Sequence, residues 1–327
     1  MNSKTFCPLL WNHQMIDGSG RVKPCCRFDN SMLDQVPNVN DIPLKDIFHS
    51  DLMNSLREKS AAGERIPQCH RCYIEEDGGK RSLRQKKIKH EIIGSDIDIY
   101  TPKITYLELA ISNNCNLACR MCDSRFSHRL YDEEVEYSGK AKCSQRHVNV
   151  DLTKIEDYLP DLNFIKFTGG EPLIIPDHWR LLKKAMESGY AGNISLNYAT
   201  NGTVWPKEKY IEIWKHFKHI ELMVSIDSVI PEENEYQRHY TDHAQVIKNF
   251  DRYIELSKDC LPMKIVVRPT ITIYNVYHLP ELTEYLAGKG VKFNATHLTY
   301  PSHQRVTVLP KKYKDLINKK FDNFNFS

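Results

Sequence analysis

Residues 112–122 read SNNCNLACRMC and place Cys115, Cys119 and Cys122 within eight positions. They directly follow a β-rich run at residues 104–110, which predicts a strand. Three thiolates at this spacing can wrap one face of a four-iron cluster, and the asparagines beside them tolerate the turns that wrapping requires. No fourth cysteine lies nearby, so one iron is expected to stay open. A zinc site is the alternative, but zinc usually has a fourth protein ligand.

The bulk composition is that of a folded, non-membrane protein. The 327 residues suffice for one large domain, or for a domain with a small appendage. With 45 basic and 42 acidic residues the net charge is only +3, a balance that argues neither for nor against nucleic acid. Nucleic acid is nevertheless not the expected partner. No apolar run approaches the ~18 residues of a membrane helix, and no signal peptide is visible. We therefore expect a soluble, cytoplasmic protein whose clustered cysteines bind metal.

From residue 104 onward, short β-rich runs alternate with amphipathic stretches. Six strands are predicted, at residues 104–110, 164–167, 194–199, 220–226, 264–272 and 292–297. Helices are predicted between them, at residues 177–188, 206–217, 243–257 and 279–287. Parallel neighbours need helical crossovers, so this order predicts an α/β fold with a partial (β/α)6 barrel of the TIM type. Six strands are too few to close the barrel.

Candidate binding residues recur just after these strands, where chemistry sits in barrels of this kind. The second strand runs into TGGEP at residues 168–172, in which two glycines let the backbone approach a ligand closely. Asn201 follows the third strand. Ser225 and Asp227 lie on one face at the end of the fourth strand and suit a ribose. Taken singly, the glycines and Asn201 also fit plain turns, and Ser225 or Asp227 fits a helix cap.

Taken together and in this order, C-x-x-x-C-x-x-C, GGEP and S-x-D resemble the core of a radical S-adenosylmethionine (SAM) enzyme, from residue 104 to about 301. Met121 stands where many members of that family carry an aromatic residue. The resemblance implies a cluster on Cys115, Cys119 and Cys122 whose open iron binds the amino and carboxylate groups of SAM. Reductive cleavage then gives methionine and a 5′-deoxyadenosyl radical, which takes a hydrogen atom from a substrate.

The same resemblance implies roles for single residues. Gly169, Gly170 and Glu171 are implied for the methionine amine, and Ser225 and Asp227 for the ribose, with Asn201 as a weaker candidate. Arg238 or Arg268 is implied for the methionine carboxylate as a charge-assisted donor, and the sequence does not choose between them.

The first quarter of the chain contains five more cysteines and resembles the auxiliary-cluster domain called SPASM, in its short form called twitch. The resemblance rests on Cys7-Pro8, Trp11, the Gly20-x-x-x-x-Cys25 spacing and Cys69-x-x-Cys72. It implies a second, fully ligated four-iron cluster on Cys7, Cys25, Cys69 and Cys72, with Cys25 favoured over Cys26. Such domains usually follow the barrel, whereas this one precedes it. A structural zinc ribbon with His70 as a spare ligand is the alternative.

The expected organisation is an auxiliary-cluster domain at residues 1–79, a basic connector at 80–103, the barrel at 104–301 and a tail with a short helix at 302–327. The connector has basic residues in its first part, which we interpret as a solvated helix face rather than an anion-binding patch: Lys80, Arg81, Arg84, Lys86, Lys87 and Lys89.

The function expected from the resemblance is that of a radical SAM oxidoreductase or maturase. It would oxidise or crosslink a peptide, a protein side chain or a small molecule, with the second cluster accepting an electron. A flavodoxin- or ferredoxin-type reductant is the expected partner. The alternative is a zinc-stabilised module that binds nucleic acid or protein, which predicts zinc and no iron.

Overall fold

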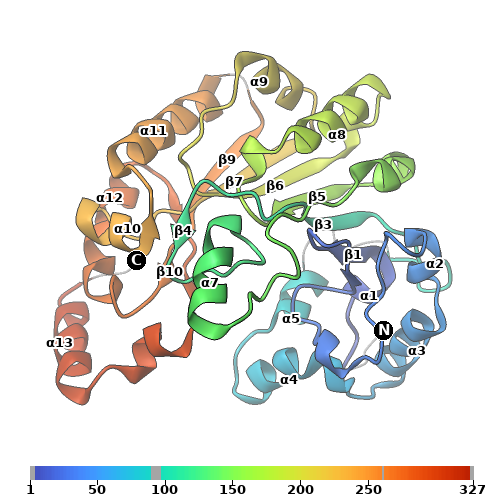
Figure 1. Ribbon diagram of the computed structural model, residues 1–327, viewed down its shortest axis with the longest axis horizontal. Coiled ribbons are helices and arrows are strands. Elements are labelled where there is room, and N and C mark those ends of the chain that lie inside the picture. Colours follow the sequence, from blue (N-terminus) through green and yellow to red (C-terminus); the bar gives the residue numbers. More distant parts are fainter. Residues whose placement is uncertain (1–3, 90–96, 260, 325–327) are drawn as a thin grey trace.

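The computed structural model describes residues 4–89, 97–259 and 261–324. Its centre is an eight-stranded sheet in the order β11-β9-β7-β6-β5-β3-β1-β2 (Figure 1). Six parallel strands form the barrel part: β3 (Tyr106–Ala110), β5 (Phe164–Thr168), β6 (Ser195–Thr200), β7 (His219–Val224), β9 (Met263–Val267) and β11 (Lys292–Phe293). The predicted α/β partial barrel of the TIM type is confirmed.

Helices cover the outer face of this sheet (Figure 1). The four predicted crossover helices are α8 (Pro176–Glu187), α9 (Glu208–Trp214), α11 (His243–Asp259) and α12 (Leu279–Gly288). Three further helices are α7 (Tyr131–Ser138), α10 (Pro231–Gln237) and α13 (Lys311–Asp322), the last of which is the short helix expected in the tail. Apolar side chains of the strands and of the four crossover helices share one continuous core, whereas Ile317 of α13 packs with Val276 and Leu279 in a separate small cluster.

Two predicted strands are shorter than expected because each divides. The run at 264–272 divides into β9 and β10 (Thr270–Ile271), separated by Pro269, which has no N–H to donate to a ladder. The run at 292–297 divides into β11 and β12 (Thr296–His297). β10 and β12 pair in parallel as a separate small sheet, so the two segments stay side by side after they leave β9 and β11.

The cysteine-rich first quarter joins the same sheet. β1 (His13–Ile16) pairs in parallel with β3, and β2 (Val22–Lys23) pairs antiparallel with β1. The helices of this part are α1 (Leu9–Asn12), α2 (Leu44–Phe48), α3 (Asp51–Ala62), α4 (His70–Asp77) and α5 (Leu83–Ile88). Backbone pairing therefore connects the two parts of the chain on either side of residues 79–104. The domain boundaries expected there stay a prediction. Part of the expected connector, including His90, lies outside the described residues.

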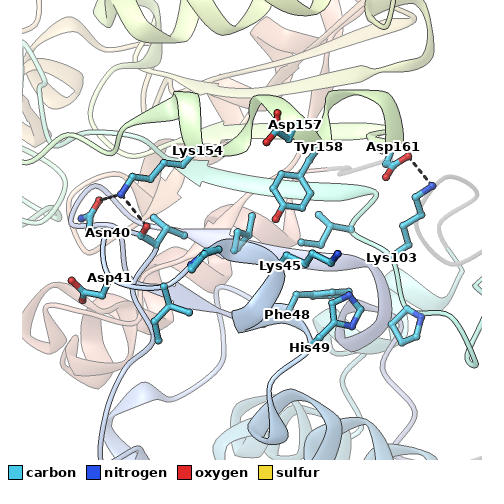
Figure 2. Close-up of a pocket in the computed structure, with 16 residues that line it drawn as sticks. Asn40, Asp41, Lys45, Phe48, His49, Lys103, Lys154, Asp157, Tyr158 and Asp161 are labelled. Atoms are coloured by element: carbon cyan, nitrogen blue, oxygen red, sulfur yellow. Dashed lines mark hydrogen bonds and ion pairs between the residues drawn. The ribbon is translucent and has the colours of Figure 1, made fainter.

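A pocket of about 770 Å³ lies between the first quarter and the segment before β5 (Figure 2). At one end of the pocket, Lys154 Nζ donates to Val39 O at 3.0 Å and to Asn40 Oδ1 at 3.3 Å. Lys103 and Asp161 form an ion pair of 2.7 Å at its other end. Its lining includes residues just before β3 and β5, so the pocket opens at the amino ends of the strands, opposite the cysteine loop that follows β3.

Behind the sheet, His178 is fully buried against Phe167 and Tyr198. Trp214 Nε1 donates to the Tyr198 hydroxyl at 3.2 Å, which leaves the hydroxyl proton for Nε2 of a neutral His178 at 2.7 Å. Burial lowers the pKa of His178 to about 3. Because the unfolded chain binds this proton near pH 6.5, stability is expected to fall as pH drops from 6.5 towards 3.

We expect this histidine to cost at most about 1.4 kcal/mol per pH unit in that window. Urea unfolding of His178→Gln at several pH values measures the effect, with the exposed His216→Gln as the control. The slope of stability against pH should flatten in His178→Gln alone. An unchanged slope would show that the His178 side chain does not titrate with folding.

Candidate functional site

The cysteine loop after β3 is held by the asparagines that flank Cys115. Asn113 Nδ2 donates to Ser124 O at 3.0 Å and to Arg146 O at 2.9 Å, and its Oδ1 accepts from Val148 N. Asn116 Nδ2 donates to Thr203 Oγ1 at 2.8 Å. These side chains replace the backbone ladder that an irregular loop lacks, so the positions of the cysteines are fixed from both sides.

The two glycines after β5 pack directly against this loop. Gly170 N donates to Ser112 O at 2.8 Å, and Glu171 N donates to Asn114 O at 2.9 Å. A Cβ on Gly170 would lie 2.0 Å from Asn114 O, and Gly169 has a φ of +104°. Only glycine fits both positions. The turn formed by Gly169, Gly170 and Glu171, the GGE turn, thus positions the cysteine loop. The N–H groups of Gly170 and Glu171 are used for that purpose.

The three thiols lie close enough to influence each other. Burial raises the pKa of Cys115 to about 12, and burial together with the neighbouring Cys119 and Cys115 raises the pKa of Cys122 well above 9. Cys115 Sγ accepts hydrogen bonds from Leu117 N at 3.5 Å and from Asn201 Nδ2 at 3.9 Å. Buried thiols with such donors suit an iron–sulfur cluster, whose irons replace the protons.

Glu171 is completely buried at the junction of β5 and β6. Its carboxylate accepts hydrogen bonds from Leu173 N, Thr200 Oγ1 and Asn201 N at 2.7 to 3.1 Å. Burial nevertheless raises the pKa of Glu171 to about 7, against the lowering effect of these donors. The Glu171 side chain holds Asn201 in place, and the side-chain amide of Asn201 in turn contacts Cys115 and Asn116. The contact of Glu171 with the methionine amine stays a prediction.

β7 ends at Val224, so Ser225 and Asp227 belong to the following loop rather than to one strand face. Asp227 is buried, with Oδ1 accepting from Thr270 N at 2.7 Å and Oδ2 lying 2.7 Å from Arg238 Nε. That N–H does not point at the oxygen, so the contact is an ion pair without a directed hydrogen bond. Ser225 is half-buried and is the more accessible of the two ribose candidates.

The two candidate arginines sit differently. Arg238 lies in β8 (Arg238–His239), which pairs antiparallel with β4 (Ala118–Cys119). Its Nη1 is 3.9 Å from Cys119 Sγ, at the cysteine loop itself. Arg268, just after β9, donates from Nε to Thr296 Oγ1 at 2.9 Å and from Nη1 to Met223 Sδ at 3.4 Å.

A second group of cysteines lines one pocket in the first quarter of the chain. Its members are Cys7, Cys25, Cys69 and Cys72. Burial raises the pKa of Cys7 and of Cys69 to about 12, and each has a neighbouring cysteine that adds to the shift. Cys26 is not among the lining residues, and His70, 37% exposed, contacts Pro67 O. No three described His, Cys, Asp or Glu side chains are gathered tightly enough for one metal ion. A four-iron cluster spreads its ligands over separate irons.

The interpretation of the connector as a solvated helix face is wrong for two of its residues. Arg84 is 5% exposed, donates to Phe6 O at 2.7 Å and pairs with Glu76. Lys87 Nζ lies 5.2 Å from the ring centre of Tyr106, and burial followed by the charge of Lys166 lowers its pKa to about 8. The helix α5 therefore packs against the protein, because its basic residues have aromatic and acidic partners inside. Lys80, Arg81, Lys86 and Lys89 are exposed as expected.

The structure also reveals a row of polar residues that the sequence analysis did not single out. One polar side chain from each of five strands lies in register on the inner sheet face: Glu108, Lys166, Asn197, Glu221 and Lys264. Hydrogen bonds of 2.6 to 2.8 Å join Lys166 to Glu108, Asn197 to Glu221 and Lys264 to Glu221. Burial would raise the pKa of Glu108, but Lys166 and His13 hold it below its usual value. A lone polar residue inside each apolar strand was the available signal.

Comparisons with known proteins give remote relatives. The mitochondrial GTP 3′,8-cyclase of Arabidopsis thaliana is 26% identical, covering 57% of this chain and 45% of that protein. The tungsten-containing aldehyde ferredoxin oxidoreductase cofactor-modifying protein of Pyrococcus furiosus is 30% identical over 57% of this chain and 49% of its own length. The chain spans about half the length of these curated relatives. Streptococcus suis SuiB bound to precursor peptide SuiA has a TM-score of 0.46 at 14% identity, covering 84% and 59% of the two chains.

Family models identify both parts of the chain. The model of the radical SAM superfamily matches residues 109–284, which hold the cysteine loop, the GGE turn and the strand ends described above. The SPASM model, an iron-sulfur cluster-binding domain, matches residues 7–73, which hold the second group of cysteines. SAM and [4Fe-4S] clusters are the cofactors that these domains imply. The chain therefore belongs to the radical SAM superfamily and has a SPASM domain at its amino end.

Proposed function

We propose that this protein cleaves SAM reductively and uses the resulting radical to take a hydrogen atom from a substrate. Bound cluster and SAM supply a 5′-deoxyadenosyl radical, which is the chemistry that no side chain can provide. The observation that carries the proposal is the three-thiol loop of Cys115, Cys119 and Cys122, held by the GGE turn at the carboxyl ends of the barrel strands. Three thiolates leave one iron of a four-iron cluster open to SAM.

The neighbouring residues of this loop suit the two ends of SAM. An arginine that meets the methionine carboxylate must lie beside the cluster, and Arg238 does so at 3.9 Å from Cys119 Sγ. Asp227 orients it and balances its charge. Gly169 and Gly170 offer carbonyls to the amine, and Ser225 offers a hydroxyl to the ribose. Arg268 contacts Met223 on the inner face of the sheet and is not proposed to bind the SAM carboxylate.

The substrate is proposed to meet the polar row on the inner sheet face. Glu108 and Asn197 are buried, each about 6% exposed, and Lys166 is 20% exposed. Glu221 and Lys264 are 28% and 44% exposed, so the most open end of the row lies towards β9. At the SPASM end, Tyr106 and Leu9 form a small buried cluster against which Cys7 and Cys25 pack. A substrate on this row would thus lie between the two clusters, which supports oxidation or crosslinking of a peptide, a protein side chain or a small molecule.

The test is formation of 5′-deoxyadenosine by anaerobically purified, iron-loaded protein after reduction. We expect stoichiometric or catalytic 5′-deoxyadenosine from the wild type and none from Cys115→Ala/Cys119→Ala/Cys122→Ala. The proposal fails if iron-loaded, reduced wild type leaves SAM intact, or if the protein contains zinc in place of iron.

Removing the Arg238 charge is expected to weaken SAM binding by about 10- to 100-fold, because one charge-assisted contact is worth about 1.5–3 kcal/mol. Arg238→Gln alone would leave Asp227 buried without a counterion, which destabilises the protein. The variant to measure is therefore Asp227→Asn/Arg238→Gln, with Asp227→Asn and Arg268→Gln as controls. Anaerobic equilibrium binding of SAM gives the Kd. An unchanged Kd in the double variant would remove Arg238 from the SAM site.

A further inference from the structure

The ribbon formed by β4 and β8 carries one cluster cysteine and reaches the molecular surface. Ala118 pairs with His239 and Cys119 pairs with Arg238 in antiparallel register. Cys119 and Arg238 point inward, since Nη1 and Sγ lie 3.9 Å apart. The residues beside this pair, Arg120 and His239, are exposed. The ribbon thus connects the cluster site to solvent within one residue of chain.

Two arginines on this surface are held by tyrosine rings rather than by carboxylates. Arg120 Cζ lies 4.0 Å from the ring centre of Tyr236, and its Nε donates to Tyr236 O at 2.8 Å. Arg129 Cζ lies 4.9 Å from the ring centre of Tyr240. Within the described ranges, neither guanidinium has an Asp or Glu oxygen within 4.0 Å. Stacking fixes their direction, and neither guanidinium is tied up in a direct ion pair with a described residue.

Tyr240 itself adopts an uncommon backbone conformation. Its φ is +71°, and no other non-glycine residue in the described part of the chain has a positive φ. A bulky residue in this region is strained by roughly 1–3 kcal/mol, and such strain concentrates at functional sites. In this strained turn Tyr240 is 60% exposed, its ring centre lies 4.0 Å from that of the tilted His239 ring, and Arg129 lies over its face.

We propose that Arg120, Arg129, Tyr236, His239 and Tyr240 form a docking patch for an acidic, flavodoxin-type electron donor that reduces the cluster on Cys115, Cys119 and Cys122. The inference rests on the proposed function, because that function needs one electron delivered from outside. The donor loses the electron and the cluster gains it, and no covalent bond changes. Exposed arginines that have no direct ion pair favour an acidic partner by steering its approach.

The test compares two electron donors by anaerobic stopped-flow absorbance of the cluster. One donor is a reduced flavodoxin of strongly negative net charge, and the other is photoreduced 5-deazaflavin, a small neutral donor that needs no docking patch. The variant is Arg120→Glu/Arg129→Glu, with Arg120→Gln/Arg129→Gln as a milder form. The matched control is Arg252→Glu, since Arg252 is exposed and stacked on Trp205 at 3.7 Å but lies on α11.

We expect reduction by flavodoxin to slow at least about tenfold at low salt in the charge-reversed variant, and less in the glutamine variant. Its rate should also lose the salt dependence of the wild type. Reduction by 5-deazaflavin should be unchanged, as should both rates in Arg252→Glu. Equal slowing with both donors, unchanged flavodoxin rates, or equal slowing in Arg252→Glu would overturn the docking patch. Normal flavodoxin rates in a wild type that leaves SAM uncut would instead overturn the proposed function.

Discussion

Gly170→Ala is expected to lose the cluster of the cysteine loop, about four irons per chain, and with it all cleavage of SAM. An alanine Cβ would lie 2.0 Å from Asn114 O and 2.6 Å from Asn114 C, both of which are backbone atoms. The loop carrying Cys115 would have to move, and it would then lose the hydrogen bonds from Gly170 N and Glu171 N. Overpacking a backbone contact of this kind costs about 3 kcal/mol or more.

Iron content after anaerobic reconstitution and the thermal midpoint measure this effect. The control is Gly192→Ala, because Gly192 has no neighbouring atom within 4 Å of a Cβ and no positive φ. It should keep the full iron content. Full iron content in Gly170→Ala would mean that the glycine turn is a plain turn with no bearing on the cluster.

Cys69→Ser/Cys72→Ser is expected to lower iron from about eight to about four per chain, while cleavage of SAM persists and product formation fails. The reason is geometric. Both residues line the pocket shared with Cys7 and Cys25, in the first quarter of the chain rather than at the cysteine loop after β3. A fully ligated cluster there has no open iron, so it would accept an electron from the substrate rather than bind SAM.

Cys26→Ser is the matched control. Cys26 lies next to Cys25 in the chain but faces Glu108 and Lys166, whose charges act on its pKa after burial. It should keep about eight irons. Retained turnover of the true substrate in Cys69→Ser/Cys72→Ser would refute the electron-accepting role, and iron loss in Cys26→Ser would refute the choice of Cys25.

The sequence was sufficient for the barrel and for the motifs at its strand ends. Period-two runs placed the six strands because each alternates side chains between a helix-covered face and an inner face. It was insufficient for the pairing of β1 with β3, since the hydrogen bonds between residues 13–16 and 106–109 leave no local pattern. Pro269 was a visible breaker inside the fifth predicted strand that the β-rich run concealed.

The fate of single polar side chains was harder to predict. Asp227 lies in a loop and is turned towards Arg238 and Thr270, which only the fold brings together. Lys87 and Arg84 look like surface charges in a basic run, yet their partners are Tyr106 and Glu76. Burial of a charged group depends on a partner supplied by another element, and composition along one segment does not reveal that partner.

The open iron is tested most directly by electron paramagnetic resonance on Cys69→Ser/Cys72→Ser, which should hold only the cluster of the cysteine loop. The spectrum of the reduced protein is recorded before and after SAM is added. A shift in the spectrum is predicted, because SAM would occupy the corner that Cys115, Cys119 and Cys122 leave free. An unchanged spectrum at saturating SAM would contradict the account.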